Sequence, residues 1–287
     1  MNTTTSIRPG IIWLASYPKS GNTWTRAFLH NLLYIMRGED KEMVDINAMS
    51  EFSTWELQAA KYAEAAGKKP EELTHDDVAA LRAKVQEMIA DEVDGLSFVK
   101  THNALVMDRG YPIINFAVTS GAIYIVRNPL DVAISFAHHM GKSIDDAIEF
   151  METEGLETEL NKKSVHEVYG SWSQHVASWT AKPHRAIYVM RYEDMLSDTE
   201  KTFGGLARHI LLNPTKEQLR KAIENSSFRK LKEQEEKSSF REKPKAAKNF
   251  FRSGKAGEWR ERLTDRQIRR IVSAHREQME RFGYYPL

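Results

Sequence analysis

Two continuous runs of apolar residues mark the clearest buried strands of the chain. Residues 11–16 form the first run, and residues 122–126 (Ala-Ile-Tyr-Ile-Val) form the second. A strand of a parallel sheet is covered on both faces, so its residues are apolar throughout and do not alternate with polar ones. Residues 186–190 and the shorter stretch 97–100 are further candidates. These segments predict a parallel sheet.

Apolar residues at helical spacing lie between the predicted strands. Residues 74–92 place their apolar side chains on one face, and Thr74 with Asp77 three residues later is typical of a helix N-cap. Helical patterns also cover residues 166–180 and 264–282, and a helix can begin at Pro129. Strands that alternate with helices predict an α/β fold whose central parallel sheet is flanked by helices.

Length and charge narrow the classes of function. The 287 residues, 41% of them hydrophobic, are enough for a sizeable core, and we expect one domain over residues 1–287. Lys and Arg total 41 against 40 for Asp and Glu, so the chain has no broad basic field that would bind nucleic acid. Any anion site must therefore be local.

The chain contains no cysteine, which excludes disulfides, thiolate metal ligands and a catalytic thiol. No stretch approaches the roughly 18 apolar residues that a membrane helix needs, and the N-terminal residues are polar. We expect a cytoplasmic protein without a transmembrane segment. The pair His138-His139 and the scattered carboxylates lack metal-ligand spacing, so no bound metal is expected.

A short polar segment joins the first strand to a helix and has the chemistry of a phosphate site. It reads Tyr17-Pro18-Lys19-Ser20-Gly21-Asn22-Thr23-Trp24. The free N–H groups and the dipole of a helix N-terminus attract anions, Lys19 adds a full charge, and the Ser, Asn and Thr side chains add donors. The alternative is an ordinary Pro-Gly turn before a helix. This motif of a strand, a phosphate-binding loop and a helix is similar to the one in nucleotide kinases.

The order of residues in this loop differs from that of the NTPases. In G-x-x-x-x-G-K-[ST] the lysine follows the glycine, whereas Lys19 precedes Gly21 and no second glycine lies upstream in register. The segment instead resembles the 5′-phosphosulfate loop of sulfotransferases that use 3′-phosphoadenosine 5′-phosphosulfate (PAPS). That resemblance implies that further motifs follow in a set order.

The second motif, Tyr-Ile-Val-Arg-Asn-Pro-Leu-Asp-Val-Ala-Ile-Ser at residues 124–135, resembles the segment of that family that holds the 3′-phosphate of the donor. Its arginine and its serine eight residues later are Arg127 and Ser135 here. A guanidinium fork and a hydroxyl are suitable partners for a phosphate. Taken alone, Arg127 could instead form a salt bridge between helices.

Four weaker segments complete the ordered set. Phe98-Val99-Lys100-Thr101-His102 resembles the segment with the family's catalytic histidine, although a lone histidine after a strand is more often structural. Arg191-Tyr192-Glu193-Asp194-Met195 and Ser226-Ser227-Phe228 resemble segments near the adenine. Residues 251–259 resemble a loop, Arg-Lys-Gly-x-x-Gly-Asp-Trp, that closes over the 3′-phosphate. Ser253 stands where that loop usually has lysine, and Lys255 or Lys248 could compensate.

The resemblance, which spans residues 11–259, implies a role for each matching residue. His102 would be the general base, Lys19 would stabilise the leaving oxygen, and Lys100 would add a second positive charge. Trp24 would flank the adenine, although it could equally be a core aromatic. The donor-binding set implied by the resemblance consists of Lys19, Ser20, Gly21, Asn22, Thr23, Trp24, Arg127, Ser135, Tyr192, Ser226, Phe228, Arg252, Ser253 and Gly254.

The sequence thus predicts a sulfotransferase that moves the sulfonyl group of PAPS to an acceptor hydroxyl without a metal. The alternatives are a nucleotide-dependent kinase and a catalytically silent nucleotide-binding module. The predicted acceptor wall, residues 37–70 and 136–163, permits a small-molecule, lipid, glycan or peptide-scaffold hydroxyl, and the oligomeric state stays open. The charged segment 229–248 reads as a solvated helix end and a mobile loop, which the resemblance suggests is a cap over the donor.

Overall fold

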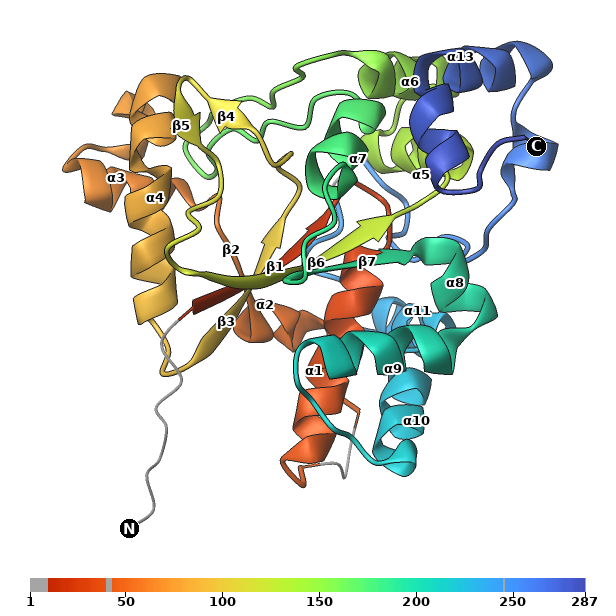
Figure 1. Cartoon of the computed structure of the whole chain (residues 1–287), viewed down its shortest axis with the longest axis horizontal. Helices are drawn as coiled ribbons and strands as arrows, with labels where there is room; N and C mark the ends of the chain where they lie inside the picture. The colour runs from red at the N-terminus through yellow and green to blue at the C-terminus, as the bar shows by residue number, and fades with distance from the viewer. Residues whose placement is uncertain (1–9, 40–42, 245, 287) are drawn as a thin grey trace. The chain divides into compact units, whose positions relative to one another are not determined.

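A five-stranded sheet forms the centre of the protein, which is described here from a computed structural model covering residues 10–39, 43–244 and 246–286 (Figure 1). The strand order is β2-β3-β1-β6-β7, and β1 pairs in parallel with β3, which pairs in parallel with β2. The predicted α/β class with a central parallel sheet is confirmed. The sheet strands are β1 (Gly10–Ser16), β2 (Ser53–Trp55), β3 (Leu96–Thr101), β6 (Thr119–Val126) and β7 (Ile187–Arg191).

The register of β1 on β3 runs through six residue pairs, from Gly10 with Leu96 to Ala15 with Thr101. Ala15 is paired with Thr101, so the two strands finish side by side. The phosphate loop leaves β1 and the predicted catalytic histidine follows β3. Every residue of β1 is buried, which agrees with the continuous apolar run in its sequence. The carboxyl ends of adjacent parallel strands are where α/β proteins place their ligands.

The described residues form two compact units, and the chain alternates between them. Unit 1 contains residues 10–17, 53–124 and 154–187, and unit 2 contains residues 18–39, 43–52, 125–153, 188–244 and 246–286. Neither unit is a continuous stretch of sequence. One domain over the whole chain stays a prediction.

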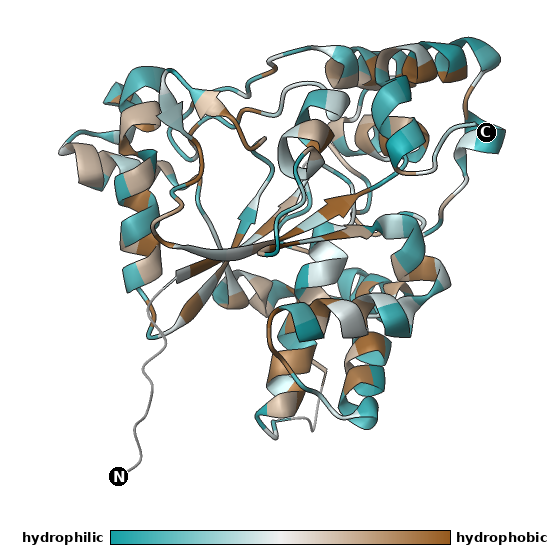
Figure 2. Ribbon diagram, viewed as in Figure 1, coloured by the Kyte–Doolittle hydropathy of each residue, from teal (hydrophilic) through white to brown (hydrophobic). Residues whose placement is uncertain are grey.

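In unit 1, helix α4 (His75–Asp91) packs on β1, β3 and α3 (Ala59–Ala66). Its hydrophobic and polar residues alternate along the helix, as Figure 2 shows. The predicted cap is confirmed, because the Thr74 hydroxyl accepts from the Asp77 N–H and the Asp77 carboxylate accepts from the Thr74 N–H. The remaining elements are the 3₁₀ helix Pro70–Glu72, the hairpin β4 (Met107–Asp108) and β5 (Tyr111–Pro112), and α7 (Trp172–Thr180).

In unit 2, α1 (Asn22–Met36) packs against α10, and α5 (Pro129–Met140) packs against α6, α12 and α13. The starts of α5 at Pro129 and of α13 after the Thr264 cap agree with the predictions. The other elements are the 3₁₀ helix Ile46–Ala48, α2 (Met49–Phe52), α6 (Ile144–Glu152), α8 (Tyr192–Ser197), α9 (Thr199–His209), α10 (Lys216–Asn225), α11 (Phe228–Ser238), α12 (Trp259–Arg262) and α13 (Asp265–Arg281).

The helix predicted over residues 166–180 is shorter than its sequence pattern suggested. Helix α7 begins at Trp172, because Gly170 takes the left-handed conformation (φ 62°) and Ser171 caps the helix by accepting from the Gln174 N–H. Residues 166–169 are not helical, and the Glu167 carbonyl accepts from the Thr158 N–H. A Ser-x-x-Gln capping box thus sets the helix start within an otherwise helical pattern.

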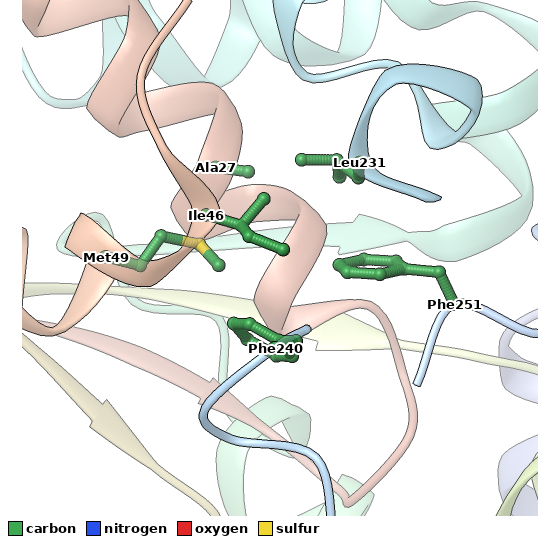
Figure 3. Close-up of a cluster of buried hydrophobic side chains, with 6 residues drawn as sticks. All are labelled: Ala27, Ile46, Met49, Leu231, Phe240 and Phe251. Atoms are coloured by element: carbon green, nitrogen blue, oxygen red, sulfur yellow. The ribbon is translucent and has the colours of Figure 1, made fainter. Parts of the chain in front are cut away.

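The charged segment 229–248 is more closely packed than its composition suggested. Leu231 of α11 and Phe240 after it are buried with Phe251 in one cluster of unit 2 (Figure 3). The cluster also contains Ala27, Ile46 and Met49. These apolar residues are too widely spaced in sequence to produce a periodic signal, and charged residues separate them. The sequence pattern therefore predicts a solvated segment, whereas two of its apolar side chains, Leu231 and Phe240, are buried in the fold.

Candidate active site

The phosphate loop has two residues with a positive φ, Gly21 and Lys19, and only the glycine favours this conformation. Gly21 caps α1 with φ 108°, and a β-carbon there would lie 2.8 Å from Cδ2 of Tyr192. Glycine is therefore needed at this position. Lys19 also has a positive φ of 68°, which is unfavourable for a residue with a β-carbon. Helix α1 starts at Asn22, so the unpaired N–H groups of its first turn belong to this loop.

The Ser20 hydroxyl has the surroundings of a ligand-binding group. Its residue is fully buried, and its hydroxyl has no hydrogen-bond partner among the residues that the structure describes. A buried hydroxyl without a partner is costly, and in native proteins such groups usually have one. A phosphate oxygen bound at the helix N-terminus would supply an acceptor. The loop thus fits the phosphate predicted for it.

The Lys19 side chain meets two residues of the same unit. Its ammonium lies 3.2 Å from Nδ1 of His139 and 4.3 Å from the centre of the Phe250 ring. An ammonium can only donate, so His139 Nδ1 accepts this hydrogen bond. No sequence motif pointed to His139, which follows the predicted Arg127 and Ser135 motif on α5.

Arg127 connects three of the predicted donor-site segments. Its Nη1 donates to the Lys19 carbonyl at 3.0 Å, and its Nη2 donates to the Lys255 carbonyl at 3.1 Å. The guanidinium carbon lies 4.2 Å from the centre of the Tyr192 ring, within the range of a cation–π contact. Only 6% of Arg127 is exposed. The strand-end arginine thereby joins the phosphate loop, the adenine-edge tyrosine and the C-terminal loop.

The aromatic residues predicted near the adenine form part of a packed group. Trp24 makes edge contacts with Tyr192, at 6.0 Å between ring centres, and with Phe203 at 5.5 Å. Trp24 therefore has the packing of a core aromatic while it lies in the phosphate-loop helix. The Ser226 hydroxyl donates to the Ala222 carbonyl at 2.8 Å, so it completes the end of α10. Ser135 is half-buried on α5.

The C-terminal loop holds its arginine with an internal acid. Arg252 donates to both carboxylate oxygens of Glu258, at 3.0 Å and 2.5 Å. Burial alone would raise the pKa of Glu258, but the hydrogen bonds from Arg252, together with the charges of Arg252 and Arg127, lower it below its usual value. Gly254 has φ 66°, and a β-carbon there would lie 2.4 Å from the Phe228 ring. Gly254 and Phe228 both belong to the predicted donor-binding set. Ser253, another member, lies between Arg252 and Gly254.

His102 belongs to unit 1 and is held by the end of β1. Its Nδ1 lies 2.7 Å from the Ser16 carbonyl oxygen. A carbonyl only accepts, so Nδ1 carries the proton and Nε2 is the nitrogen with the lone pair. This is the tautomer that a general base needs, because Nε2 can then accept a proton.

The backbone of His102 is fixed on both sides by buried side chains. Its N–H donates to the Glu167 carboxylate at 3.2 Å, and its carbonyl accepts from His175 Nε2 at 3.0 Å. His175 Nδ1 in turn accepts from the Tyr124 hydroxyl at 2.9 Å. Burial lowers the pKa of His175 to about 3, so this imidazole is neutral. Sequence reasoning missed Glu167 and His175, because both lay in a segment predicted as a plain helix.

Lys100 lies on β3, two residues before His102. Burial raises the pKa of the Glu167 carboxyl, whereas the Tyr169 hydrogen bond and the Lys100 charge act in the opposite direction. Lys100 therefore acts electrostatically on the acid that holds the His102 backbone. Lys100 and His102 belong to the same unit.

The predicted site residues divide between the two units. The whole donor-binding set lies in unit 2, and His102 with Lys100 lies in unit 1. Over residues 10–39, 43–244 and 246–286, no group of three or more His, Asp or Glu side chains is placed to hold a metal ion. None of the helices in these ranges is long and apolar enough to span a bilayer.

Comparisons with known proteins match nearly the whole chain. The family model described as "Sulfotransferase domain" matches residues 9–283. Sulfotransferase 1B1 of Canis lupus familiaris is 26% identical over 280 residues, covering 95% of this chain and 84% of the relative. Flavonol 3-sulfotransferase of Flaveria bidentis is 24% identical over 277 residues, covering 92% of this chain and 80% of the relative.

Solved structures show the same fold at lower sequence identity. Retinol dehydratase in complex with androsterone and the inactive cofactor PAP has a TM-score of 0.65 and 20% identity, covering 95% of this chain and 81% of its own. Mouse sulfotransferase SULT7A1 complexed with PAP has a TM-score of 0.62 and 21% identity, covering 96% and 85%. At these identities the likeness establishes the fold.

Proposed function

The chain belongs to the sulfotransferase domain family, and on that premise we propose that it transfers the sulfonyl group of PAPS to an acceptor hydroxyl. The products would be a sulfate ester and adenosine 3′,5′-bisphosphate. The observation that carries this proposal is the arrangement around Arg127, which joins the Lys19 carbonyl, the Lys255 carbonyl and the Tyr192 ring in one unit. Three motifs that are distant in sequence thus meet at one buried guanidinium. Two solved neighbours are complexes with PAP, which supports this choice of donor.

Bound PAPS would supply the activated sulfonyl group, and the chain's own residues would position it and manage the proton and the charge. The loop N–H groups and the Ser20 hydroxyl would hold the 5′-phosphate side. Arg127, Ser135 and Arg252 are the candidates for the 3′-phosphate, for which Arg252 would exchange Glu258 for the ligand. No metal is required, because cationic side chains and N–H groups can balance the phosphate charge.

His102 would take the proton from the acceptor hydroxyl at Nε2, the nitrogen that the Ser16 hydrogen bond leaves unprotonated. The Lys19 ammonium would stabilise the negative charge that develops on the leaving oxygen, and Lys100 would add a second positive charge. For this role Lys19 would leave His139. Transfer of this kind depends mainly on alignment and charge stabilisation, as in phosphoryl transfer.

The names of the relatives support one class of acceptor for this chain. Flavonol, 3-alpha-hydroxysteroid and luciferin sulfotransferases are among them. The first two names specify hydroxyl-bearing ring compounds. We therefore favour a small-molecule alcohol or phenol over a glycan or a peptide scaffold for this chain.

A ligand-binding measurement followed by a turnover assay tests the proposal. Adenosine 3′,5′-bisphosphate should raise the melting temperature more than ATP with magnesium, whereas a kinase should show the reverse order. Labelled PAPS should then transfer its label to one or more members of a panel of phenols, steroid alcohols and lipid alcohols. Stabilisation by the bisphosphate without transfer to any acceptor would instead support a silent binding module.

A further inference from the structure

Glu56 is a fully buried acid directly after strand β2, in the segment predicted to line the acceptor. Its exposed fraction is 0%, although acidic residues are rarely buried unless they are paired. Strand β2 pairs in parallel with β3, with Trp55 opposite Lys100. Glu56 therefore lies beside the end of the strand that leads to His102.

The two residues that flank His102 both donate to the same oxygen of Glu56. The Thr101 hydroxyl donates to Oε1 at 2.6 Å, and the Asn103 side-chain amide donates to it at 2.9 Å. The Asn103 N–H also donates to the Thr101 hydroxyl at 3.0 Å. The carboxylate thus bridges the residues before and after His102.

The second oxygen of Glu56 is also bound to a fixed donor. Gln86 Nε2 donates to Oε2 at 3.1 Å and to the Ile113 carbonyl at 2.7 Å. Gln86 Oε1 accepts from the Asn115 N–H at 2.7 Å, which defines the orientation of the amide. Glu56 therefore faces donors on both oxygens, an environment that suits a carboxylate and not an amide.

Opposing effects act on the charge of this acid. Burial raises the pKa of Glu56, while the Arg82 charge and the three hydrogen bonds act in the opposite direction. Arg82 is itself fully buried and donates to the His166 carbonyl at 2.8 Å. Both oxygens of the Glu56 carboxylate accept hydrogen bonds, and buried hydrogen bonds of this kind stabilise one arrangement of the groups that donate them.

We propose that Glu56 is a positioning residue of the transfer reaction, which holds residues 101–103 so that the His102 imidazole is aimed at the acceptor hydroxyl. This inference rests on the proposed role of His102 as general base. The imidazole is oriented by its bond to Ser16, and that bond requires the backbone of His102 to stay in place. Glu56 acts on this backbone from both sides. None of the residues predicted to hold the donor belongs to unit 1, which contains Glu56.

The test is a double-mutant cycle in single-turnover transfer from labelled PAPS, with Glu56→Gln and His102→Ala alone and together. The Gln side chain keeps one acceptor oxygen and replaces the other by an NH₂ group, so it cannot accept both from Gln86 and from Thr101 with Asn103. The bridge between residues 101–103 and Gln86 is therefore broken on one side. We expect Glu56→Gln to lower the transfer rate roughly 10- to 100-fold with unchanged affinity for adenosine 3′,5′-bisphosphate. In the His102→Ala background it should have no further effect, because the group it positions is gone.

A second pair of variants tests the bridge if Glu56→Gln does not fold. Thr101→Val removes the hydroxyl that donates to Glu56 and should slow transfer about tenfold. Thr101→Ser keeps a hydroxyl and should retain most of the rate. Thr74→Val is the control in the same unit, because the Thr74 hydroxyl accepts from the Asp77 N–H at the start of α4 and contacts no member of the Glu56 network. It should lower stability and leave the rate unchanged.

Two results would overturn the inference. One is a Glu56→Gln or Thr101→Val effect that persists at full size in the His102→Ala background, since that would make the role of Glu56 purely structural. The other is an unchanged transfer rate in a folded Thr101→Val variant. Near-normal transfer by His102→Ala alone would instead refute the proposed base, and the inference that depends on it.

Discussion

The Arg127 guanidinium donates a hydrogen bond of 3.0 Å to the carbonyl oxygen of Lys19. The residue expected to hold one phosphate of the donor therefore also holds the loop expected to bind the other. This contact explains how two motifs separated by about a third of the chain can act as one site. It also means that removal of Arg127 has both a ligand effect and a loop effect.

The effect of Arg127 on the ligand and its effect on the loop can be separated by comparing two ligands in an Arg127→Lys variant. Lysine keeps the charge but loses the planar fork that reaches the Lys19 and Lys255 carbonyls. Affinity for adenosine 3′,5′-bisphosphate should fall roughly tenfold or more, and affinity for adenosine 5′-phosphate, which lacks the 3′-phosphate, should fall less. Calorimetry with both ligands checks this, with the exposed Arg220→Lys as control. An equal loss for both ligands would remove the 3′-phosphate assignment.

We expect the Lys19 side chain to be needed for function although its backbone conformation destabilises the fold. Its φ of 68° is unfavourable for residues with a β-carbon, by about 1 kcal/mol. Lys19→Gly should therefore be more stable than Lys19→Ala by about that amount, while both variants lose donor affinity and turnover. Chemical denaturation of the two variants measures the difference. Equal stabilities would show that the backbone at residue 19 is not strained.

Local patterns predicted four of the five strands of the sheet and several helices, but they did not predict β2 (Ser53–Trp55). The continuous apolar run of β1 and the Thr74 cap of α4 are set by neighbours in sequence, and both agree with the structure. The contacts around His102 could not be predicted this way. Glu56 and His175 reach it from distant segments, and nothing in their own neighbourhoods distinguishes them from ordinary helix or loop residues. Likewise, the Ser171 cap makes α7 begin at Trp172, whereas periodicity alone predicted a start at residue 166.

The buried His175 should make the protein less stable in mild acid. Burial lowers its pKa from 6.5 to about 3 in the folded state, so between these values the unfolded chain binds a proton that the folded chain does not. Stability should therefore fall as the pH is lowered from 7.5 to 5.5, and this imidazole should account for about 1 kcal/mol of the loss.

Denaturation of His175→Gln at both pH values checks that contribution, because the variant should lose less stability than the wild type on acidification. His275, whose pKa burial lowers to about 4, is the matched control in α13. His275→Gln should reduce the acid sensitivity as well, but should leave the transfer rate unchanged. An identical pH dependence in His175→Gln and wild type would contradict the neutral, buried state of His175.

The buried apolar side chains of the charged segment 229–248 should contribute strongly to the stability of the fold. Leu231 is 2% exposed within the cluster of unit 2 (Figure 3). Leu231→Ala should cost about 2–5 kcal/mol, since it removes a buried side chain and leaves a cavity. Leu211, which is 86% exposed, provides the control, and Leu211→Ala should change the free energy of unfolding by less than about 0.5 kcal/mol. Similar values for the two variants would mean that the segment is solvated, as its composition suggested.

The most direct test of the account is single-turnover transfer from labelled PAPS by His102→Ala, with the best acceptor from the panel. The Ser16 bond involves Nδ1, so Nε2 is the nitrogen that would accept the proton in the proposed reaction. None of the residues predicted to bind the donor belongs to the unit that contains this histidine. The account predicts a transfer rate lower by roughly 10²- to 10⁴-fold, with affinity for adenosine 3′,5′-bisphosphate within about twofold of wild type. A near-normal transfer rate would contradict it and would exclude His102 from the mechanism.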